Sequence, residues 1–262
     1  MTAAILQARM GSTRLPGKVM KIVLGKPLLW QEIARLRRTP LLRKVIVATT
    51  ENQADDIVVS LAQRMRIPYF RGSEDDVLDR YYQAAKTFGV STVVRITGDC
   101  PLIDPAVVND TIRFFRSRKF DYVSNVNPPT FPDGMDAEVF SFRALRKAWR
   151  EASLPSEREH VTSFIWKHPR RFKIGNFASP KSYAHIRLTV DDPKDLILVK
   201  KIFYRLYPRK RFFTLQDIVQ LLEAQPGLLK INAGTRRNEG YLKSLKKDAA
   251  VLKGDTGLRK SI

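Results

Sequence analysis

Residues 1–118 alternate between short apolar runs and longer segments with helical periodicity. The runs are strand-length and rich in β-branched residues: Thr2–Ala8, Lys44–Thr49 and Ser91–Thr97. The other segments place their apolar residues at helical spacing: Leu28–Leu36, Asp55–Arg66, Asp75–Phe88 and Pro105–Arg118. This alternation is typical of parallel strands joined by crossover helices. It predicts an α/β fold with a mixed, mainly parallel sheet flanked by helices on both faces.

The second half of the chain is less regular. It predicts strands at Asp121–Asn125, Glu138–Phe142, Phe172–Phe177 and His185–Val190, and helices at Phe142–Ala152, Ser156–His168, Leu196–Tyr207 and Leu215–Glu223. A chain of 262 residues can bury one large core. We therefore expect a single α/β domain over residues 1–230 and a basic C-terminal tail over residues 231–262, in which 238–252 is compatible with a helix.

The charge is strongly positive. Lys and Arg number 47 against 26 Asp and Glu, a formal net charge of +21, and the residues from 200 onward hold nearly half of the excess. Such a field favours polyanionic partners: nucleic acid, an anionic membrane surface or phosphorylated small molecules. The sequence shows no apolar run of the roughly 20 residues that span a bilayer and no secretory signal pattern. With one cysteine, Cys100, no intramolecular disulfide can form, so we expect a cytoplasmic protein.

A loop rich in glycines, hydroxyls and cations follows the first expected strand. It reads Gln7-Ala8-Arg9-Met10-Gly11-Ser12-Thr13-Arg14-Leu15-Pro16-Gly17-Lys18. In an open parallel sheet, ligands bind at the carboxyl ends of the strands, and backbone N–H groups beside cations suit phosphate. A P-loop is excluded because five residues separate the two glycines and Val19 follows the lysine. The alternative is a surface turn whose arginines are merely solvated.

Two aspartates follow expected strands elsewhere in the chain. Asp99 comes directly after Ser91–Thr97, and Asp191 comes directly after His185–Val190. If the second strand enters the same sheet, both carboxylates reach one cleft and can hold a magnesium ion together with a polyphosphate. The alternative is an ordinary helix N-terminus, which suits Asp192 and Asp195 better than Asp191.

Several longer motifs resemble a known family. They are IxQARMGSTRLPGK at the start, FRGSxxDVLDRYY (Phe70–Tyr82), RITGDCPLID (Arg95–Asp104), PDGMDAEVF (Pro132–Phe140), REHVT (Arg158–Thr162), TVDDPKDL (Thr189–Leu196) and NEGYLKSLKKD (Asn238–Asp248). Together they resemble the spore-coat-polysaccharide branch of the cytidylyltransferase family, whose relatives make CMP-acylneuraminate and CMP-Kdo.

The resemblance implies a nucleotide-diphospho-sugar-transferase-like fold and a reaction. A sugar acid would be activated by CTP, with Mg²⁺, to give a CMP-sugar and pyrophosphate for surface polysaccharide or glycoconjugate synthesis. By analogy with such relatives, we also expect a homodimer.

It also implies site residues. Arg9, Lys18 and Asp99 would be catalytic; Gln7, Ala8, Arg9, Gly11, Ser12, Arg14, Lys18, Arg71, Arg80 and Thr97 would bind the nucleotide; Asp99 and Asp191 would bind the metal; and Asp133, Asp136, Glu138, Glu159 and His160 would lie near an anionic sugar. Thr97 departs from the family pattern, because the Kdo and acylneuraminate enzymes carry a glutamine there that helps to read cytosine. The strictness for CTP and the identity of the sugar therefore stay open.

Two other functions compete with this interpretation. A sugar-nucleotide-dependent glycosyltransferase can share the fold, but Arg9, Arg14 and Lys18 suit a triphosphate and a departing pyrophosphate better. A nucleic-acid-binding protein is suggested by charge alone, because the sequence has no RNA-recognition signature or zinc finger. We therefore expect no specific nucleic-acid partner. Cys100 is expected to pack rather than react, because the neighbouring Asp99 disfavours its thiolate.

Overall fold

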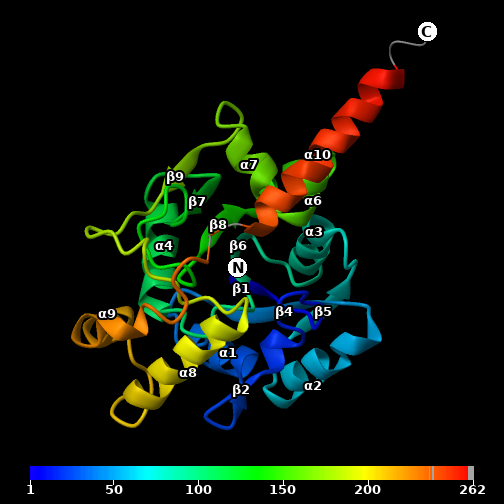
Figure 1. Ribbon diagram of the computed structural model, residues 1–262. Coiled ribbons are helices and arrows are strands. Elements are labelled where there is room, and N and C mark those ends of the chain that lie inside the picture. The colour runs from blue at the N-terminus through cyan, green and yellow to red at the C-terminus, as the bar shows by residue number, and fades with distance from the viewer. Residues whose placement is uncertain (236, 238, 259–262) are drawn as a thin grey trace.

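The computed structural model describes residues 1–235, 237 and 239–258, with side chains described as far as Leu252 (Figure 1). Its main sheet has seven strands in the order β5-β4-β1-β6-β8-β7-β9. Four neighbours are parallel: β5 (Tyr69–Gly72), β4 (Lys44–Thr50), β1 (Thr2–Gln7) and β6 (Thr92–Thr97). The other three are β8 (Glu138–Ser141), antiparallel to both neighbours, then β7 (Tyr122–Ser124) and β9 (Ile174–Asn176), parallel to each other. The sheet is thus mixed and mainly parallel, as predicted.

Both faces of this sheet are buried. In β1, Ala4 and Leu6 join one core while Ala3 and Ile5 join the other, which explains why the strand is apolar throughout. Helices α1 (Leu28–Leu36), α2 (Asp56–Arg64) and α4 (Pro105–Ser117) contribute to the first core. Helices α3 (Val77–Thr87), α5 (Phe142–Glu151) and α7 (Ser163–Lys167) contribute to the second.

A third core lies beside the sheet. It joins α8 (Pro193–Leu206) and α9 (Leu215–Ala224) to loop residues such as Leu15, Met135 and Leu188. The short hairpin of β2 (Ile22–Val23) and β3 (Lys26–Pro27) contributes Val23. The remaining elements are three 3-10 turns and two helices: η1 (Lys18–Met20), η2 (Gln53–Asp55), η3 (Pro226–Leu228), α6 (Pro155–Glu159) and α10 (Glu239–Leu258). Helix α10 packs against α6 and then runs outward from the body of the molecule (Figure 1).

Two sequence predictions are wrong. The segment His185–Val190 is not a strand: it forms one isolated bridge, between Asp133 and Arg187. The predicted helix Ser156–His168 is two short helices, α6 and α7. Between them Val161 is fully buried with a φ of 60°, a left-handed conformation that ends a helix.

The predicted tail forms α10 from Glu239 onward, while Arg236, Asn238 and residues 259–262 lie outside the described part of the chain. The domain boundary at residue 230 stays a prediction. None of the described helices combines the length and the hydrophobicity that crossing a bilayer requires.

Candidate active site

The strand order creates a crevice between β1 and β6. From β1 the chain builds outward through β4 and β5, and it then returns to place β6 on the other side of β1. At such a reversal the connections leave the two strands in opposite directions, which opens a ligand crevice at their carboxyl ends. The ends coincide, because Gln7 lies opposite Thr97 and Gly98 N–H donates to the Gln7 carbonyl at 2.8 Å. A Cβ on Gly98 would lie 2.9 Å from that oxygen, so the close approach requires glycine.

A cavity of about 320 Å³, here called the phosphate cavity, opens at this crevice. It is lined by five cations and two carboxylates: Arg9, Arg14, Lys18, Arg80 and Arg95, with Asp99 and Glu159. Every residue predicted to bind the nucleotide lines it except Arg71. The loop after β1 is therefore not a solvated surface turn but one wall of a cationic cavity.

The loop is fixed at its base by contacts that the sequence does not reveal. Gly17 N–H donates to the Met10 carbonyl at 3.1 Å and has a φ of 65°, which favours glycine. Met10 N–H in turn donates to the buried carboxylate of Asp55 at 2.6 Å. Asp55 thus ties the loop after β1 to the turn after β4.

Arg71 lies apart from the phosphate cavity. Its guanidinium donates to the carbonyls of Thr50 and Asn52, each at 2.9 Å, and to Asp56 at 2.6 Å. These contacts close the turn after β4. The structure therefore does not bring Arg71 to the other residues predicted to bind the nucleotide.

Lys18 lies between the two aspartates predicted to bind the metal. Its ammonium Nζ is 2.7 Å from Asp99 Oδ2 and 2.8 Å from Asp191 Oδ1. Burial alone would raise the pKa of Asp99, but the charge and hydrogen bond of Lys18 outweigh it and lower the pKa to about 2. Burial would likewise lower the pKa of Lys18, and the two carboxylates instead hold it above its usual range. Lys18 and Asp99 are therefore both charged at neutral pH.

Asp191 reaches this place without a strand. Val190 N–H donates to the Asp99 carbonyl at 2.8 Å, and Leu188 N–H donates to the Asp133 carbonyl at 2.7 Å. Gly134 makes this approach possible: its φ is 100°, and a Cβ there would lie 2.6 Å from the Thr189 nitrogen. Asp191 thus lies close to Asp99, on the other side of the Lys18 ammonium, although the strand that was expected to carry it is absent.

The neighbouring acids have structural partners. Asp192 caps α8 by accepting from the N–H groups of Lys194 (2.8 Å) and Asp195 (3.0 Å), as the helix-terminus alternative predicts. Arg187 binds Asp133 at 2.6 Å, Asp191 at 2.7 Å and Asp195 at 3.0 Å. Asp133 thus binds Arg187 instead of lining either cavity described here.

The aspartate pair fits a hard cation in donor chemistry. Both residues offer carboxylate oxygens, the ligands that Mg²⁺ prefers, and both contact the Lys18 ammonium, while Asp191 also pairs with Arg14 and Arg187. In the part of the chain that the structure describes, no group of three or more His, Cys, Asp or Glu could hold a metal ion. A magnesium ion here would therefore need further oxygen ligands, such as nucleotide phosphates and water.

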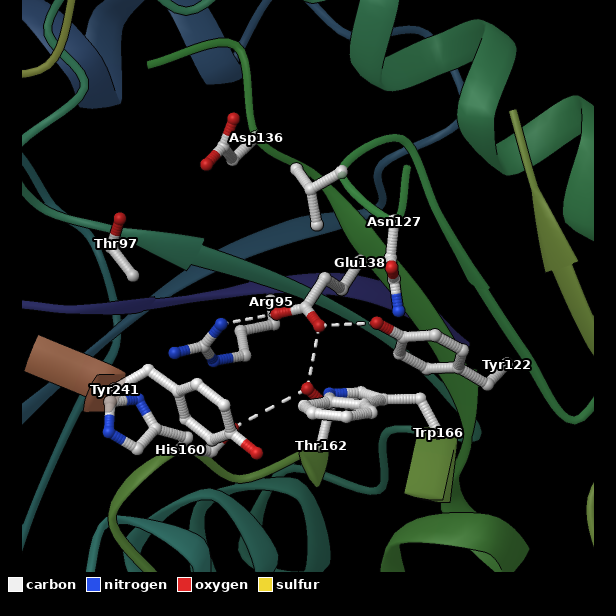
Figure 2. Close-up of a pocket in the computed structure, with 11 residues that line it drawn as sticks. Arg95, Thr97, Tyr122, Asn127, Asp136, Glu138, His160, Thr162, Trp166 and Tyr241 are labelled. Carbon is white, nitrogen blue, oxygen red and sulfur yellow. Dashed lines mark hydrogen bonds and ion pairs between the residues drawn. The ribbon is translucent and has the colours of Figure 1, made fainter. Parts of the chain in front are cut away.

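A second cavity of about 330 Å³, here called the acceptor cavity, shares Arg95, Thr97 and His160 with the first. Glu138 is central to it: Tyr122 Oη donates to its carboxylate at 2.5 Å, Thr162 Oγ1 donates at 2.6 Å, and Arg95 forms an ion pair with it (Figure 2). The other lining residues are Val126, Asn127, Asp136, Trp166 and Tyr241.

Three further predicted sugar-side residues lie around these cavities. Asp136 pairs with Arg237 at 2.6 Å, and burial raises its pKa to about 7 although Arg237 opposes the rise. His160 Nε2 lies 2.8 Å from Ser244 Oγ of α10; burial lowers its pKa to about 4, so the ring is neutral at pH 7. Glu159 accepts from the same hydroxyl at 2.8 Å and lines the phosphate cavity.

Sequence reasoning missed several lining residues. Arg95 and Thr162 lie inside motifs that were recognised, so their positions carried a signal. Tyr122 and Trp166 carried none, because they reach the cavity only through long-range packing. Cys100 is buried, and burial raises the pKa of its thiol well above the usual range, which confirms the prediction that it packs rather than reacts.

The chain resembles proteins that are already described. Residues 3–227 match the model of a family described as cytidylyltransferase. An uncharacterized protein of Methanocaldococcus jannaschii is 36% identical over 89% of this chain and 95% of its own length. The spore coat polysaccharide biosynthesis protein SpsF of Bacillus subtilis is 31% identical over 85% of this chain and 94% of its own. A solved cytidylyltransferase from Leptospira borgpetersenii has a TM-score of 0.84 at 30% identity, covering 90% of this chain and 99% of that one.

Proposed function

The chain belongs to the cytidylyltransferase family and is a nucleotidyltransferase, and we propose that it transfers the CMP group of CTP to a sugar hydroxyl. Pyrophosphate would be released, and the product would serve the synthesis of a surface polysaccharide, as the name of the Bacillus subtilis relative suggests. The observation that carries the proposal is the phosphate cavity, where five cations and the Lys18–Asp99–Asp191 cluster meet at the reversal of the strand order.

The residues have separable roles in such a transfer. The acceptor oxygen would attack the α-phosphorus, forming one P–O bond while the bond to the leaving pyrophosphate breaks. Reactions of this kind depend on positioning and charge neutralisation more than on covalent help from the protein. Arg9, Arg14 and Lys18 would offset the charge that accumulates on the pyrophosphate. Asp136 lines the acceptor cavity and would accept the hydroxyl proton, since its pKa of about 7 is closer to neutral pH than that of His160.

Asp99 and Asp191 are the residues that would hold a magnesium ion. When bound, the ion would neutralise phosphate charge and polarise the P–O bonds. Thr97 Oγ1 donates to Asp99 Oδ1 at 2.7 Å, which fixes the orientation of that carboxylate. Thr97 therefore orients Asp99 at the position where related enzymes carry a base-reading glutamine. The magnesium requirement, the homodimer and the cytoplasmic location stay predictions, as does the sugar acid that the resemblance implies.

The test is a pyrophosphate-release assay with magnesium, a panel of nucleoside triphosphates and a panel of sugars. We expect CTP to be preferred, and we expect Asp99→Asn to lower turnover by about 10²-fold, as losses of preorganised charge stabilisation do. Asp110→Asn is the matched control, because Asp110 is exposed on α4 and pairs with Arg113. Equal use of all triphosphates, or near-normal turnover of Asp99→Asn, would contradict the proposal.

A further inference from the structure

The two adjacent cavities differ in charge. Five cations and two carboxylates line the phosphate cavity. In the acceptor cavity, Arg95 is the one cation among the described lining residues, against the carboxylates of Asp136 and Glu138. The charge of Arg95 is already matched by Glu138. The acceptor cavity therefore has no excess positive charge with which to attract an anion.

Two further cations contact lining residues and are already engaged. Arg237 binds Asp136 at 2.6 Å, and Lys167 donates to Ser156 Oγ at 3.0 Å with its ammonium 5.7 Å from the centroid of the Tyr241 ring. Neither residue lines the acceptor cavity. A ligand carboxylate in this cavity would thus find no free cation, because Glu138 already pairs with Arg95 and Asp136 with Arg237, an arrangement that disfavours its binding.

The direction of the hydrogen bonds points the same way. The hydroxyls of Tyr122 and Thr162 direct their protons to Glu138 (Figure 2), and the hydroxyl of Thr97 directs its proton to Asp99. A hydroxyl has one proton and two acceptor lone pairs, so these groups can only accept from a ligand. Donors remain on the Asn127 amide, on the N–H groups of Arg95 that Glu138 does not engage, on the Trp166 indole and on the Tyr241 hydroxyl. The three hydroxyls nevertheless add acceptors that suit a ligand with hydroxyl or amino donors.

The apolar part of the wall is aromatic. Trp166 of α7 and Tyr241 of α10 meet edge to face with ring centroids 5.5 Å apart. Aromatic faces suit the C–H surface of a sugar ring, and they attract an ammonium group. Neither effect favours a carboxylate.

We infer that the acceptor cavity binds a sugar bearing hydroxyl or amino groups and no carboxylate. The inference rests on the proposed function for the reaction in which this sugar takes part. The acceptor would then be a sugar without a carboxylate, and not the sugar acid that the family resemblance implies.

The binding experiment uses Trp166 as a reporter inside the cavity. Fluorescence quenching is measured with glucose, glucosamine and glucuronate, and with the matching neutral, amino and acid forms of galactose and mannose, using Trp166→Phe as the blank. We expect the neutral or amino form of at least one sugar to bind about ten-fold or more tightly than its acid. Equal or tighter binding of the acids would overturn the inference, as would the absence of a Trp166-dependent signal from any sugar.

Two variants test the physical cause. Glu138→Gln removes the partner of Arg95 and should shift the ratio of acid to neutral affinity toward the acid by about ten-fold. Asp136→Asn should shift the ratio in the same direction and keeps the Arg95–Glu138 pair, so it serves if Glu138→Gln does not fold. The matched control, Asp110→Asn, removes a carboxylate elsewhere and should leave the ratio unchanged. An unchanged ratio in a folded Glu138→Gln and in Asp136→Asn would contradict the charge argument.

Failure of this inference can be told apart from failure of the proposed function. CTP binding is measured separately by equilibrium dialysis, and it depends on the phosphate cavity. If CTP binds and is turned over but acids are preferred, the inference alone is wrong. If CTP does not bind while neutral sugars quench Trp166, the proposed function is wrong and the binding preference stands.

Discussion

At the scale of single residues, Lys18 connects the phosphate cavity to both aspartates. Lys18→Met would leave Asp99 and Asp191 without their shared ammonium and would remove a cation from the cavity. We expect turnover with CTP to fall by about 10²-fold, because preorganised charge is lost where phosphate charge develops. Lys21→Met is the control, since Lys21 is exposed three residues later in the same loop region. Steady-state rates of the two variants within a few-fold of each other would contradict this role.

His160 makes stability depend on pH in a definite direction. Burial lowers its pKa from 6.5 to about 4, so between these values the unfolded chain binds the proton more readily than the folded one. The contribution of neutral His160 to the free energy of unfolding is therefore fully present above pH 6.5. It is lost as the pH falls toward 4, by up to about 3 kcal/mol.

The measurement is urea unfolding of the wild type and of His160→Gln at pH 8 and at pH 4.5. The difference at pH 8 reports lost contacts, because the histidine is neutral in both states there. We expect the wild type to lose more stability than the variant on acidification. Equal losses in the two proteins would show that the protonation of His160 is not linked to folding.

At the scale of elements, the sequence predicts three of the four parallel strands because each of them has a local signal, and it misses the short edge strand β5. The apolar runs of β1, β4 and β6 are buried on both faces, and the helices between them keep one apolar side. The segment after Tyr183 has strand-like composition, yet its N–H groups bond to single carbonyls of Asp99 and Asp133 and not to a neighbouring strand. No local pattern encodes such a contact.

The residues of the candidate site likewise divide into those that a local sequence pattern predicts and those that it does not. Arg9, Lys18 and Asp99 are predictable because they follow strands whose ends must meet in a parallel sheet. Arg71 lies within β5, which is at the sheet edge, two strands away from β1, and its side chain turns to the β4 loop. Tyr241 belongs to a helix that lies far away in sequence from the rest of its cavity, so only the fold brings it there.

Helix α10 supplies a wall of the acceptor cavity from beyond the matched family region, which ends at residue 227. Tyr241→Ala should raise the KM for the acceptor by about ten-fold and leave the KM for CTP unchanged, because the aromatic face contacts only the acceptor cavity. Leu242→Ala is the matched control, because Leu242 directly follows Tyr241 and its side chain is 52% exposed. Steady-state kinetics in each substrate give both constants. A larger change in the CTP constant than in the acceptor constant would contradict this assignment.

At the scale of the whole molecule, the chain carries a formal net charge of +21, and its two cavities differ in charge. The cationic phosphate cavity and the field around it attract CTP over long distances, and salt screens such attraction within about 10 Å at 0.1 M. We expect the KM for CTP to rise several-fold between about 50 and 500 mM KCl. The KM for an uncharged acceptor should hardly change, so this second constant is the internal control. Equal salt dependence of both constants would show that salt acts on the fold or on catalysis rather than on the attraction of CTP.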